Sequence, residues 1–551
     1  MSVMAYAPFG AGGVIIRVEA DIRRGIPGID ITGLAEGAVR EARERARAAF
    51  RNSGFKFPMD RVLINLAPAG LRKDGAALDL PIALAVMAAA GLAPAPASLL
   101  VMGELELSGR IRPVRGVLAA IAAGLDEGIR EFVVPAGNAA EAAILPSARF
   151  AAVSTLREAV EALFSREETG TLAAALPTAL PTTLPAVSAG KAAEGAREEV
   201  ACGDFADARG QPMYKRALEI AAAGGHNVLV FGPPGAGKTM LARMLPSIMA
   251  PLSAEEAVEV TRLHSLAGSF VPGAASKNGA QGDSQGNFID RLITRPPFRA
   301  PHHSASAEGI LGGGRTPRPG EISLAHFGVL FMDEVPEFKT KVLQALREPL
   351  EDRLISISRA EGTLRFPAEF QLLLAANACP CGRLGKRQWE PAARADCLCS
   401  PEEIYRYWRK FCGALLDRVE LRVPVVPPKI SDISSPSRGA EESSAEIARR
   451  VRAATDIQGK RREASGIRRN ALIPAGKIEA LCPMTEKARS AAQTALAKLG
   501  LSGRAYHGIL RVARTIADLD GKDSIDAIHV LEAVQHRRHG EDPYEIVSAG
   551  W

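Results

Sequence analysis

The residues that most clearly indicate a binding or catalytic site form a glycine-rich loop, "GPPGAGKT", between the apolar run "VLVF" and a helical pattern. Backbone N–H groups of such a loop can wrap around phosphates. The lysine reaches the β- and γ-phosphates, and the threonine hydroxyl can ligate Mg²⁺. This spacing in a strand–loop–helix context predicts a site for ATP and Mg²⁺. Its expected members are Gly232, Pro233, Pro234, Gly235, Ala236, Gly237, Lys238 and Thr239.

Two further apolar runs end in polar residues that could complete a hydrolytic site. "GVLFMDEVPEF" ends its run at Asp333 and Glu334, and "FQLLLAANACP" ends its run at Asn377. Ligands bind at the carboxyl ends of strands in open α/β sheets. We expect Asp333 to hold Mg²⁺ through its water shell, Glu334 to polarise the attacking water and Asn377 to orient it. Together with the loop, these motifs indicate an ATPase of the AAA+ type.

Positioning these motifs requires a parallel sheet with helices on both faces, and the chain has room for further domains. Residues 1–166 alternate β-branched and Ala-rich stretches, which favours an α+β domain. Ala, Thr and Pro dominate residues 167–200, which we interpret as a linker. The ATPase core is expected at 201–428, a polar linker at 429–446 and a helical C-terminal domain at 447–551.

Composition places the chain among globular proteins. Of its 551 residues, 47% are hydrophobic and 24% charged, and the net charge of +6 permits a nucleic-acid partner without indicating one. No secretory signal is visible, and the longest apolar run is broken by Pro94 and Pro96, which favours a buried helix over a membrane span. We expect a cytoplasmic protein with no membrane partner, whose thiols are reduced.

Several longer segments carry a family resemblance that covers nearly the whole chain. "DFADARGQPMYKRALEIAAAGGHNVLVFGPPGAGKTMLAR", "RPPFRAPHHSAS" and "LSGRAYHGILRVARTIADL" resemble the magnesium-chelatase-like AAA+ proteins of bacteria, in particular the ComM (YifB) competence family. The resemblance implies a Lon-protease-like N-terminal domain, an AAA+ P-loop core and a helical C-terminal lid. It also implies a homo-hexameric ring that hydrolyses ATP and promotes branch migration while transforming DNA is integrated.

Two arginines take their expected roles from this resemblance. Arg418 in "GALLDRVEL" matches the family position that reaches into the neighbouring subunit's ATP site. There a cation stabilises charge on the transferring phosphoryl group. Arg504 in "LSGRAYHG" matches the lid arginine that senses the γ-phosphate. A surface salt bridge is the alternative interpretation for either residue.

The N-terminal region resembles the Lon protease domain but has lost its chemistry. Lon-like proteases use a Ser–Lys pair. This sequence has Ala77 at the position of the nucleophile and Ala120 at the position of the lysine. Neither an activated hydroxyl nor a base remains, so we expect no peptidase activity and a structural or interaction role instead.

Four of the seven cysteines follow Asn377 within a short segment. They form two Cys-x-Cys pairs, Cys379 with Cys381 and Cys397 with Cys399. Four thiolates are the number that a closed, structural Zn²⁺ site needs, although the pairs are tighter than the usual Cys-x₂-Cys. We expect zinc to staple the loop beyond Asn377. Buried unliganded thiols, a redox pair and a disulfide are the alternatives, and a reducing compartment disfavours the last.

A candidate hairpin and a candidate insert carry basic residues that could bind DNA. "LEDRLISISRAEGTLRFPAEF" predicts two strands joined by a turn, and "GGGRTPRPGEIS" resembles a second insert of this clade. In AAA+ proteins of this clade such a hairpin projects into the pore. The candidate phosphate contacts are Arg315, Arg318, Arg359 and Arg365. Charge that merely solubilises exposed turns is the alternative.

Two histidines in "FRAPHHSAS" also suggest metal binding. Neighbouring residues on a strand point to opposite faces, so we expect His302 and His303 to have conformational or hydrogen-bonding roles rather than to share an ion.

Three functions remain in competition. The first is a DNA motor acting on single-stranded or branched DNA, and the second is an ATPase chaperone for metal insertion, like the magnesium-chelatase subunit. The resemblance implies that such chelatase subunits lack a Lon-like domain, which favours the motor. The third, a non-catalytic platform, is disfavoured by the complete set of ATPase residues.

Overall fold

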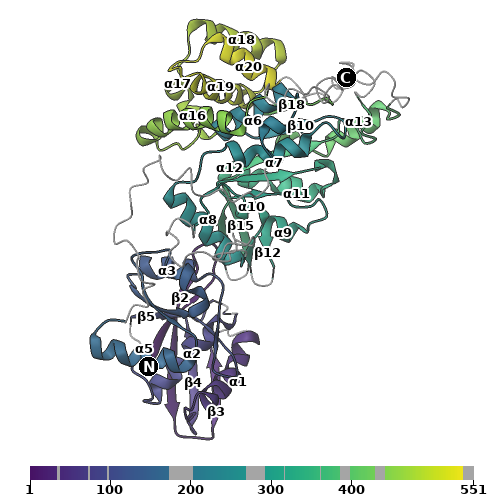
Figure 1. Ribbon diagram of the computed structural model, residues 1–551. Coiled ribbons are helices and arrows are strands. Elements are labelled where there is room, and N and C mark those ends of the chain that lie inside the picture. The colour runs from purple at the N-terminus through teal and green to yellow at the C-terminus, as the bar shows by residue number, and fades with distance from the viewer. Residues whose placement is uncertain are drawn as a thin grey trace.

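The computed structural model shows an elongated chain with the N-terminal domain at one end and the C-terminal helices at the other (Figure 1). The structure describes residues 1–33, 37–71, 73, 75–95, 98–172, 203–268, 292–314, 317–359, 362–384, 397–411, 413–427 and 441–537. Of the expected linker at 167–200, residues 173–200 lie outside these ranges, as does Arg315, whereas residues 167–169 continue the helix Leu156–Thr169.

The N-terminal domain is built on a seven-stranded sheet in the order β3-β4-β2-β1-β5-β8-β9. Strand β1 pairs antiparallel with β2 and parallel with β5, so one half of the sheet is mixed and the other half is parallel. The elements are β1 (Ser2–Ala7), β2 (Val14–Arg23), β3 (Gly28–Thr32), α1 (Gly37–Asn52), β4 (Arg61–Ala67), α2 (Asp79–Ala89), β5 (Leu99–Val101), β6 (Glu104–Leu105), β7 (Ile111–Arg112), α3 (Val117–Asp126), β8 (Glu131–Pro135), α4 (Ala139–Ala142), β9 (Arg149–Val153) and α5 (Leu156–Thr169).

The middle region contains the expected parallel sheet, in the order β11-β14-β17-β10-β18. Its elements are α6 (Pro212–Gly224), β10 (Val228–Phe231), α7 (Lys238–Ile248), α8 (Ala254–Ala267), β11 (Phe298–Arg299), α9 (Ala307–Leu311), β12 (Gly312–Gly313), β13 (Arg318–Pro319), α10 (Glu321–Leu324), β14 (Val329–Met332), α11 (Thr340–Ala345), α12 (Arg347–Asp352), β15 (Leu354–Arg359), β16 (Gly362–Pro367), β17 (Gln371–Ala376), α13 (Pro401–Arg409), α14 (Gly413–Leu416) and β18 (Leu421–Pro424).

Alternating side chains of the central strands divide between two cores. Val228 and Val230 of β10 belong to one hydrophobic cluster, whereas Leu229 belongs to the other. Every residue of β17 is buried, as expected for a strand covered on both faces. The three strands that end at the predicted ATP site are therefore held by packing from both sides.

The C-terminal region is helical, as the sequence predicted: α16 (Ser444–Ser465), α17 (Ile478–Leu481), α18 (Glu486–Leu499), α19 (Gly503–Leu519) and α20 (Ala527–Arg537). Val451 and Ile516 of these helices share one cluster with Val228 of the central sheet. Helix α16 begins three residues before the expected boundary at 447, because Ser443 and Glu446 form a capping box. The lid is thus packed on the core through a continuous apolar interface.

The predicted hairpin is present at the side of the middle region that faces the N-terminal domain, and the predicted insert forms a second hairpin there (Figure 1). Strands β15 and β16 pair antiparallel, and Arg359 is opposite Gly362 across the turn. Strands β12 and β13 form the second, shorter hairpin.

Within the ranges that the structure describes, none of the helices combines the length and the apolar character needed to cross a bilayer.

Candidate ATP site

Positive-φ glycines shape the phosphate loop. Gly237 adopts a left-handed conformation, φ 82°, and directly precedes α7. A side chain at Gly232 would collide with the backbone carbonyl of Val425, so the loop can pass the end of β18 only with glycine there. The loop's N–H groups and the N-terminus of α7 thereby share one concave surface, which suits an anion.

The Lys238 side chain lies across this surface. Its ammonium donates to the carbonyl oxygens of Gly232 and Pro233 at 2.8 and 2.9 Å, and to Asn377 Oδ1 at 3.2 Å. The first and third of the predicted motifs therefore meet at one amine. An incoming polyphosphate would exchange these neutral acceptors for anionic oxygens, which are stronger partners for an ammonium group.

Burial lowers the pKa of Lys238 from its usual value to about 8, against the opposing effect of the nearby Asp333 and Glu334 carboxylates. The side chain is only 8% exposed. A cation that is poorly solvated in the free protein has the most to gain from a phosphate. The electrostatics of the site therefore favour binding of an anion.

A second contact joins the phosphate loop to the acidic strand end. Thr239 Oγ1 donates to Asp333 Oδ2 at 2.7 Å, and the backbone N–H of Glu334 donates to Asp333 Oδ1 at 2.9 Å. Hydroxyl and carboxylate oxygens are the ligands that Mg²⁺ prefers, and the ion usually keeps several waters. The residues present therefore fit Mg²⁺, held by Thr239 and, through water, by Asp333.

Glu334 is held in an uncommon conformation beside a histidine that sequence reasoning did not assign to the site. Its backbone is left-handed, with φ 50° and ψ 47°. Glu334 Oε2 lies 3.5 Å from His303 Nδ1. The rings of His302 and His303 lie 4.1 Å apart in a turn. Our premise that the two histidines occupy a strand was wrong, because β11 ends at Arg299.

The two predicted arginines share an acceptor that lies outside the phosphate loop. Arg418 and Arg504 each donate an Nη2 hydrogen bond to the same oxygen, Oε1 of Glu351. Arg418 lies just before β18, and Arg504 lies in the first turn of α19. In this single chain both arginines make salt bridges to Glu351, which brings the two cations together at one carboxylate.

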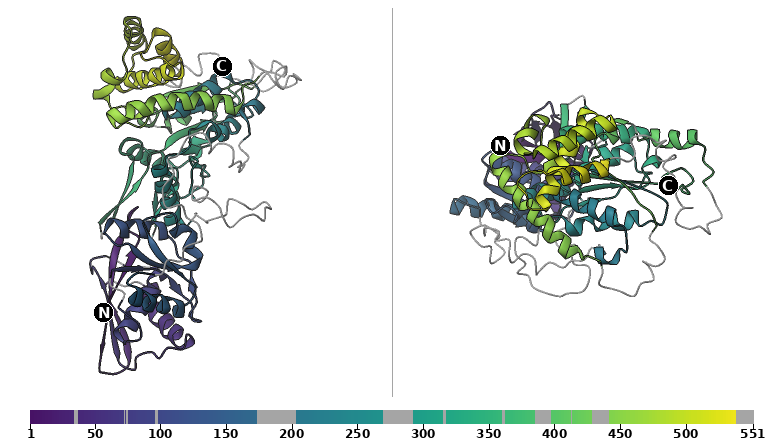
Figure 2. Two further views of the ribbon diagram at one scale, coloured as in Figure 1. Left: turned by 60° about the vertical axis from the view of Figure 1, so that its left-hand side comes forward. Right: turned by 90° about the horizontal axis from the view of Figure 1, so that it is seen from above.

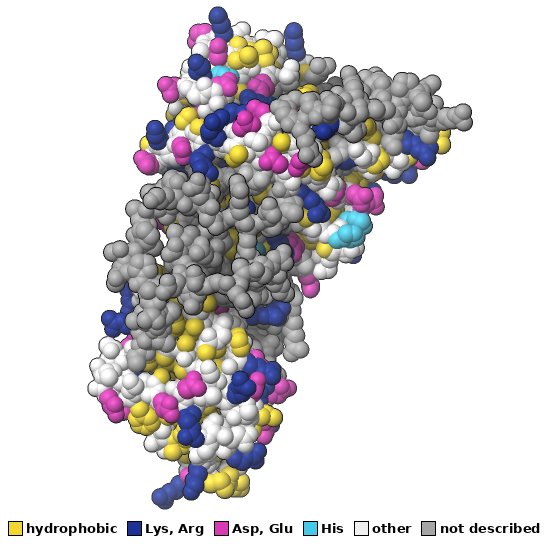
Figure 3. Space-filling model, in the orientation of Figure 1, with side chains coloured by type: hydrophobic (Ala, Val, Ile, Leu, Met, Phe, Trp, Pro, Cys, Tyr) yellow, Lys and Arg dark blue, Asp and Glu magenta, His cyan; other side chains and the backbone are white. Residues whose placement is uncertain are grey.

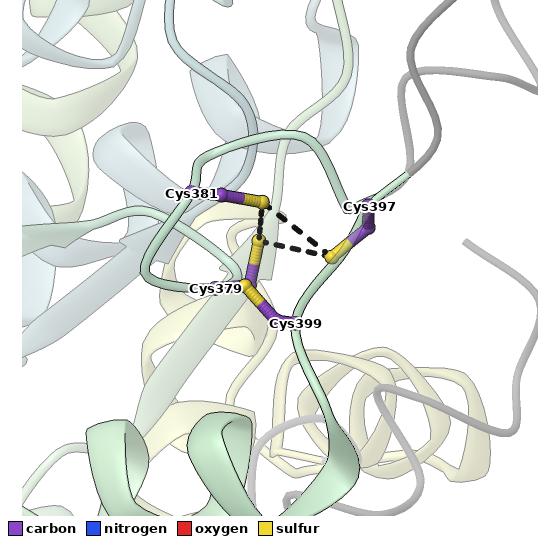
Figure 4. Close-up of side chains that lie close together, drawn as sticks. All are labelled: Cys379, Cys381, Cys397 and Cys399. Atoms are coloured by element: carbon purple, nitrogen blue, oxygen red, sulfur yellow. Dashed lines mark hydrogen bonds between the residues drawn. The ribbon is translucent and has the colours of Figure 1, made fainter.

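The four cysteines converge at the loop beyond Asn377 (Figure 4), and their Sγ atoms all lie within 4.8 Å of one another. The Sγ–Sγ distances are 3.4 Å for Cys379–Cys381, 3.5 Å for Cys381–Cys397 and 3.6 Å for Cys379–Cys397. A tetrahedral Zn²⁺ with bonds of about 2.3 Å places its sulfurs about 3.8 Å apart. The donor set and spacing therefore fit zinc.

Local hydrogen bonds also suit a thiolate cluster. The backbone N–H of Leu384 donates to Cys379 Sγ at 3.3 Å. Burial raises the pKa of the Cys379 and Cys397 thiols. At Cys381 burial acts in the same direction, but hydrogen bonds from the Arg383 backbone and from neighbouring thiols outweigh it and bring the pKa down to about 7. Of the other three cysteines, Cys482 is buried, and Cys202 and Cys412 lie outside the described residues.

The cysteine loop also touches the ATP site. A Cβ placed on Gly382 would lie 3.2 Å from Pro234 of the phosphate loop and 3.9 Å from Asn377 Nδ2. The indole N–H of Trp408 donates to the carbonyl of Ala378 at 3.0 Å. The loop thus packs directly on two parts of the nucleotide site.

Three of the four predicted DNA contacts are described, and all three are exposed: Arg318, Arg359 and Arg365. Arg359 donates to the carbonyl of Gly314, which joins the two hairpins. On the face shown in Figure 3, basic and acidic side chains are interspersed, and no single basic field dominates. The charge pattern on this face does not by itself mark a surface for DNA.

In the N-terminal domain, both positions of the Ser–Lys pair are apolar. Ala77 lies in a 3₁₀ turn before α2, and Ala120 is fully buried in α3. The nearby Lys73 is also buried, and its amine donates to the carbonyls of Gly33 and Pro68. Its pKa is lowered by burial.

Three protein-family models match the chain. "Magnesium chelatase, subunit ChlI" covers residues 204–433, and "Magnesium chelatase, subunit ChlI C-terminal" covers 441–537. A third, "Subunit ChlI of Mg-chelatase", covers residues 18–138. The last description removes our argument that a domain of this kind disfavours a chelatase role.

Curated relatives align over nearly the full length. "Competence protein ComM" of Haemophilus influenzae is 38% identical over 97% of each chain. "Uncharacterized protein YifB" of Salmonella typhimurium is 38% identical over 96% of each chain. A Lon protease of Desulfovibrio desulfuricans is 29% identical over 142 residues, which are 24% of this chain and 16% of the protease.

Proposed function

Since this chain belongs to the ComM/YifB family, whose members share magnesium-chelatase-like AAA+ domains, we propose that it is an ATP-driven, hexameric DNA motor. Its proposed task is branch migration while transforming DNA is integrated. The observation that carries the proposal is the full-length similarity to a protein named for competence. The basic hairpins supply a surface suited to the proposed substrate.

In the proposed hydrolysis, the residues of the strand ends act on the γ-phosphate and its attacking water. Lys238 neutralises the phosphate oxygens, and Thr239 and Asp333 hold Mg²⁺, which supplies charge stabilisation when bound. Glu334 accepts a proton from the water. Asn377, already hydrogen-bonded to Lys238, orients that water. Before nucleotide binds, the Glu334 carboxylate lies beside His303 in place of the attacking water. This contact supports a role in which Glu334 exchanges His303 for the water.

We propose that Arg418 and Arg504 act together at a neighbouring subunit's nucleotide. Their shared acceptor, Glu351, supports this, because two cations that meet at one carboxylate can move to one polyphosphate together. On ring assembly, the two arginines leave Glu351 and bind the γ-phosphate of the neighbouring subunit's nucleotide. This assembly would explain why the predicted arginines share Glu351 as an acceptor within the single chain.

We propose that Zn²⁺ bound by the four cysteines has a structural role. Four protein ligands leave no open position for a substrate water. Gly382 packs against Pro234 and Asn377, which suggests that the metal would hold the cysteine loop in place beside the phosphate loop.

The proposed DNA contacts are the four hairpin arginines, acting on phosphates without regard to sequence. The test is a branch-migration assay with the combined variant Arg315→Ala, Arg318→Ala, Arg359→Ala and Arg365→Ala. Migration should be lost while basal ATP hydrolysis and assembly remain. The slope of log affinity for single-stranded DNA against log salt should become shallower by up to about 3, at about 0.7 per lost phosphate contact.

A control variant should remove as much charge from the lid. Four exposed cations there are Arg449, Arg452, Lys460 and Arg489. Their combined replacement by Ala should leave migration and the salt slope near wild type. Wild-type migration by a well-folded hairpin variant would remove the proposed DNA contact.

Chelatase-type metal insertion remains the competing function. It would be favoured if the rate of ATP hydrolysis did not change on addition of DNA.

A further inference from the structure

The N-terminal domain has lost its protease residues, yet the surface around them is engaged. Helix α3 carries Ala120 at the former lysine position and contacts α8 of the middle region. Leu266 of α8 is 8% exposed and belongs to the same apolar cluster as Val117 and Ala120. A helix of the ATPase region is therefore anchored in the core of the protease-like domain, and the left view of Figure 2 shows the two regions in contact.

A buried polar contact strengthens this anchor. Ser265 Oγ donates to Glu141 Oε1, and the same carboxylate oxygen accepts from the Leu118 backbone N–H at 2.9 Å. Asn138 Nδ2 donates to the other carboxylate oxygen at 3.0 Å. Glu141 is only 4% exposed, so separating the two domains would cost it a satisfied partner.

The loop between β1 and β2, residues 8–13, reaches the predicted DNA hairpin. The backbone N–H of Ala11 donates to the carbonyl of Arg365 in β16 at 3.2 Å. The carbonyl of Ala11 accepts from Arg262 of α8, from Nε at 3.0 Å and Nη2 at 2.8 Å. One residue thereby links the N-terminal domain to both the hairpin and α8.

The approach is so close that it requires glycine. Gly10 has φ +64°, and a Cβ there would lie 2.9 Å from the Arg365 carbonyl oxygen and 3.3 Å from its backbone nitrogen. Only the backbone of Arg365 is engaged, and its side chain stays exposed. The docked loop thus holds the edge of β16 without covering the guanidinium group.

We propose that the protease-like domain is a brace for the DNA hairpin: residues 8–13 and the α3–α8 contact fix the direction of β15 and β16. The consequence for DNA rests on the proposed function, whereas the docking itself does not. A hairpin held in a fixed direction can pass a conformational change at the nucleotide site on to the bound DNA. A hairpin that is free to bend moves without displacing the DNA. This gives a domain without peptidase residues a mechanical role.

The test is Gly10→Ala in the full-length chain, compared with Gly128→Ala. Gly128 has φ +82° in the same domain, and a Cβ added there would meet no heavy atom within 4 Å, so it shares the backbone strain and lacks the hairpin contact. In Gly10→Ala, hydrogen exchange at the amides of β16 should be about fivefold faster, as for the loss of one net hydrogen bond. DNA-stimulated ATPase should fall by at least a similar factor, with basal ATPase unchanged.

Arg262→Gln, which removes the bonds to Ala11 from the α8 side, should act in the same direction. Wild-type exchange in both variants would overturn the docking. Faster exchange with equal or higher DNA-stimulated turnover would overturn the brace, because the contact would then be idle or inhibitory. If the wild-type chain shows no DNA stimulation, the proposed function fails, and faster β16 exchange in Gly10→Ala alone still supports the docking.

Discussion

Binding of ATP should draw a proton into the site, because Lys238 is poorly solvated before nucleotide arrives. Its pKa in the free protein is about 8, lowered chiefly by burial. A polyphosphate stabilises the charged form, so the bound pKa should return to 10.5 or above. Between these values the free lysine is largely neutral and the bound lysine is charged.

The size of the effect follows from the two pKa values. Net uptake should be about 0.1 proton per ATP at pH 7, about 0.5 at pH 8 and about 0.9 at pH 9. The apparent Kd should rise about fivefold from pH 8 to pH 9. The sign for stability is opposite to the usual lysine case. The unfolded chain binds this proton up to pH 10.5 and the folded chain loses it near pH 8, so the nucleotide-free protein gains stability as pH rises between them.

Calorimetric titration in buffers of different ionisation enthalpy measures the uptake directly. Lys238→Arg is the control, because a guanidinium stays charged over this range and should bind ATP without uptake. Proton release, or no uptake at pH 9 by a wild-type chain that binds ATP normally, would refute the reasoning.

Three further outcomes are expected. Glu334→Gln should keep ATP affinity but lower turnover at least about 100-fold, as single-turnover kinetics would show, and wild-type turnover would mean that another group activates the water. Arg418→Ala should be inactive alone yet partly recover when mixed with Lys238→Ala chains, because each contributes what the other lacks, and a mixture without recovery argues against a shared site. Elemental analysis should find about one zinc per chain, lost in Cys397→Ser and kept in Cys482→Ser, and near-zero zinc in the wild type would exclude the metal.

The convergence of the three candidate ATP-site motifs could be predicted because each motif is local in sequence. A strand, a glycine loop and a helix start carry Lys238, and two apolar runs carry Asp333 and Asn377 to the same sheet edge. The parallel sheet of the middle region followed from the same runs, whereas the Lon-like fold and the lid were expected from the family resemblance. The start of α16 was missed by three residues, although Ser443 and Glu446 have the spacing of a capping box.

Contacts between distant segments left no such signal. Glu351 lies 67 residues from Arg418 and 153 from Arg504, and nothing in its neighbourhood marks it as their common acceptor. The approach of His303 to Glu334 depends on a turn after a two-residue strand. The docking of Ala11 on Arg365 joins distant parts of the chain through backbone atoms, which any sequence supplies. Tertiary packing, which the sequence pattern does not show, brings each of these three pairs of segments together.

The most direct test of the DNA motor is the rate of ATP hydrolysis by the purified wild-type chain without DNA and with single-stranded, duplex or branched DNA. The motor predicts stimulation by single-stranded or branched DNA that weakens as salt rises. Equal rates under all four conditions, from a chain that hydrolyses ATP, would contradict it.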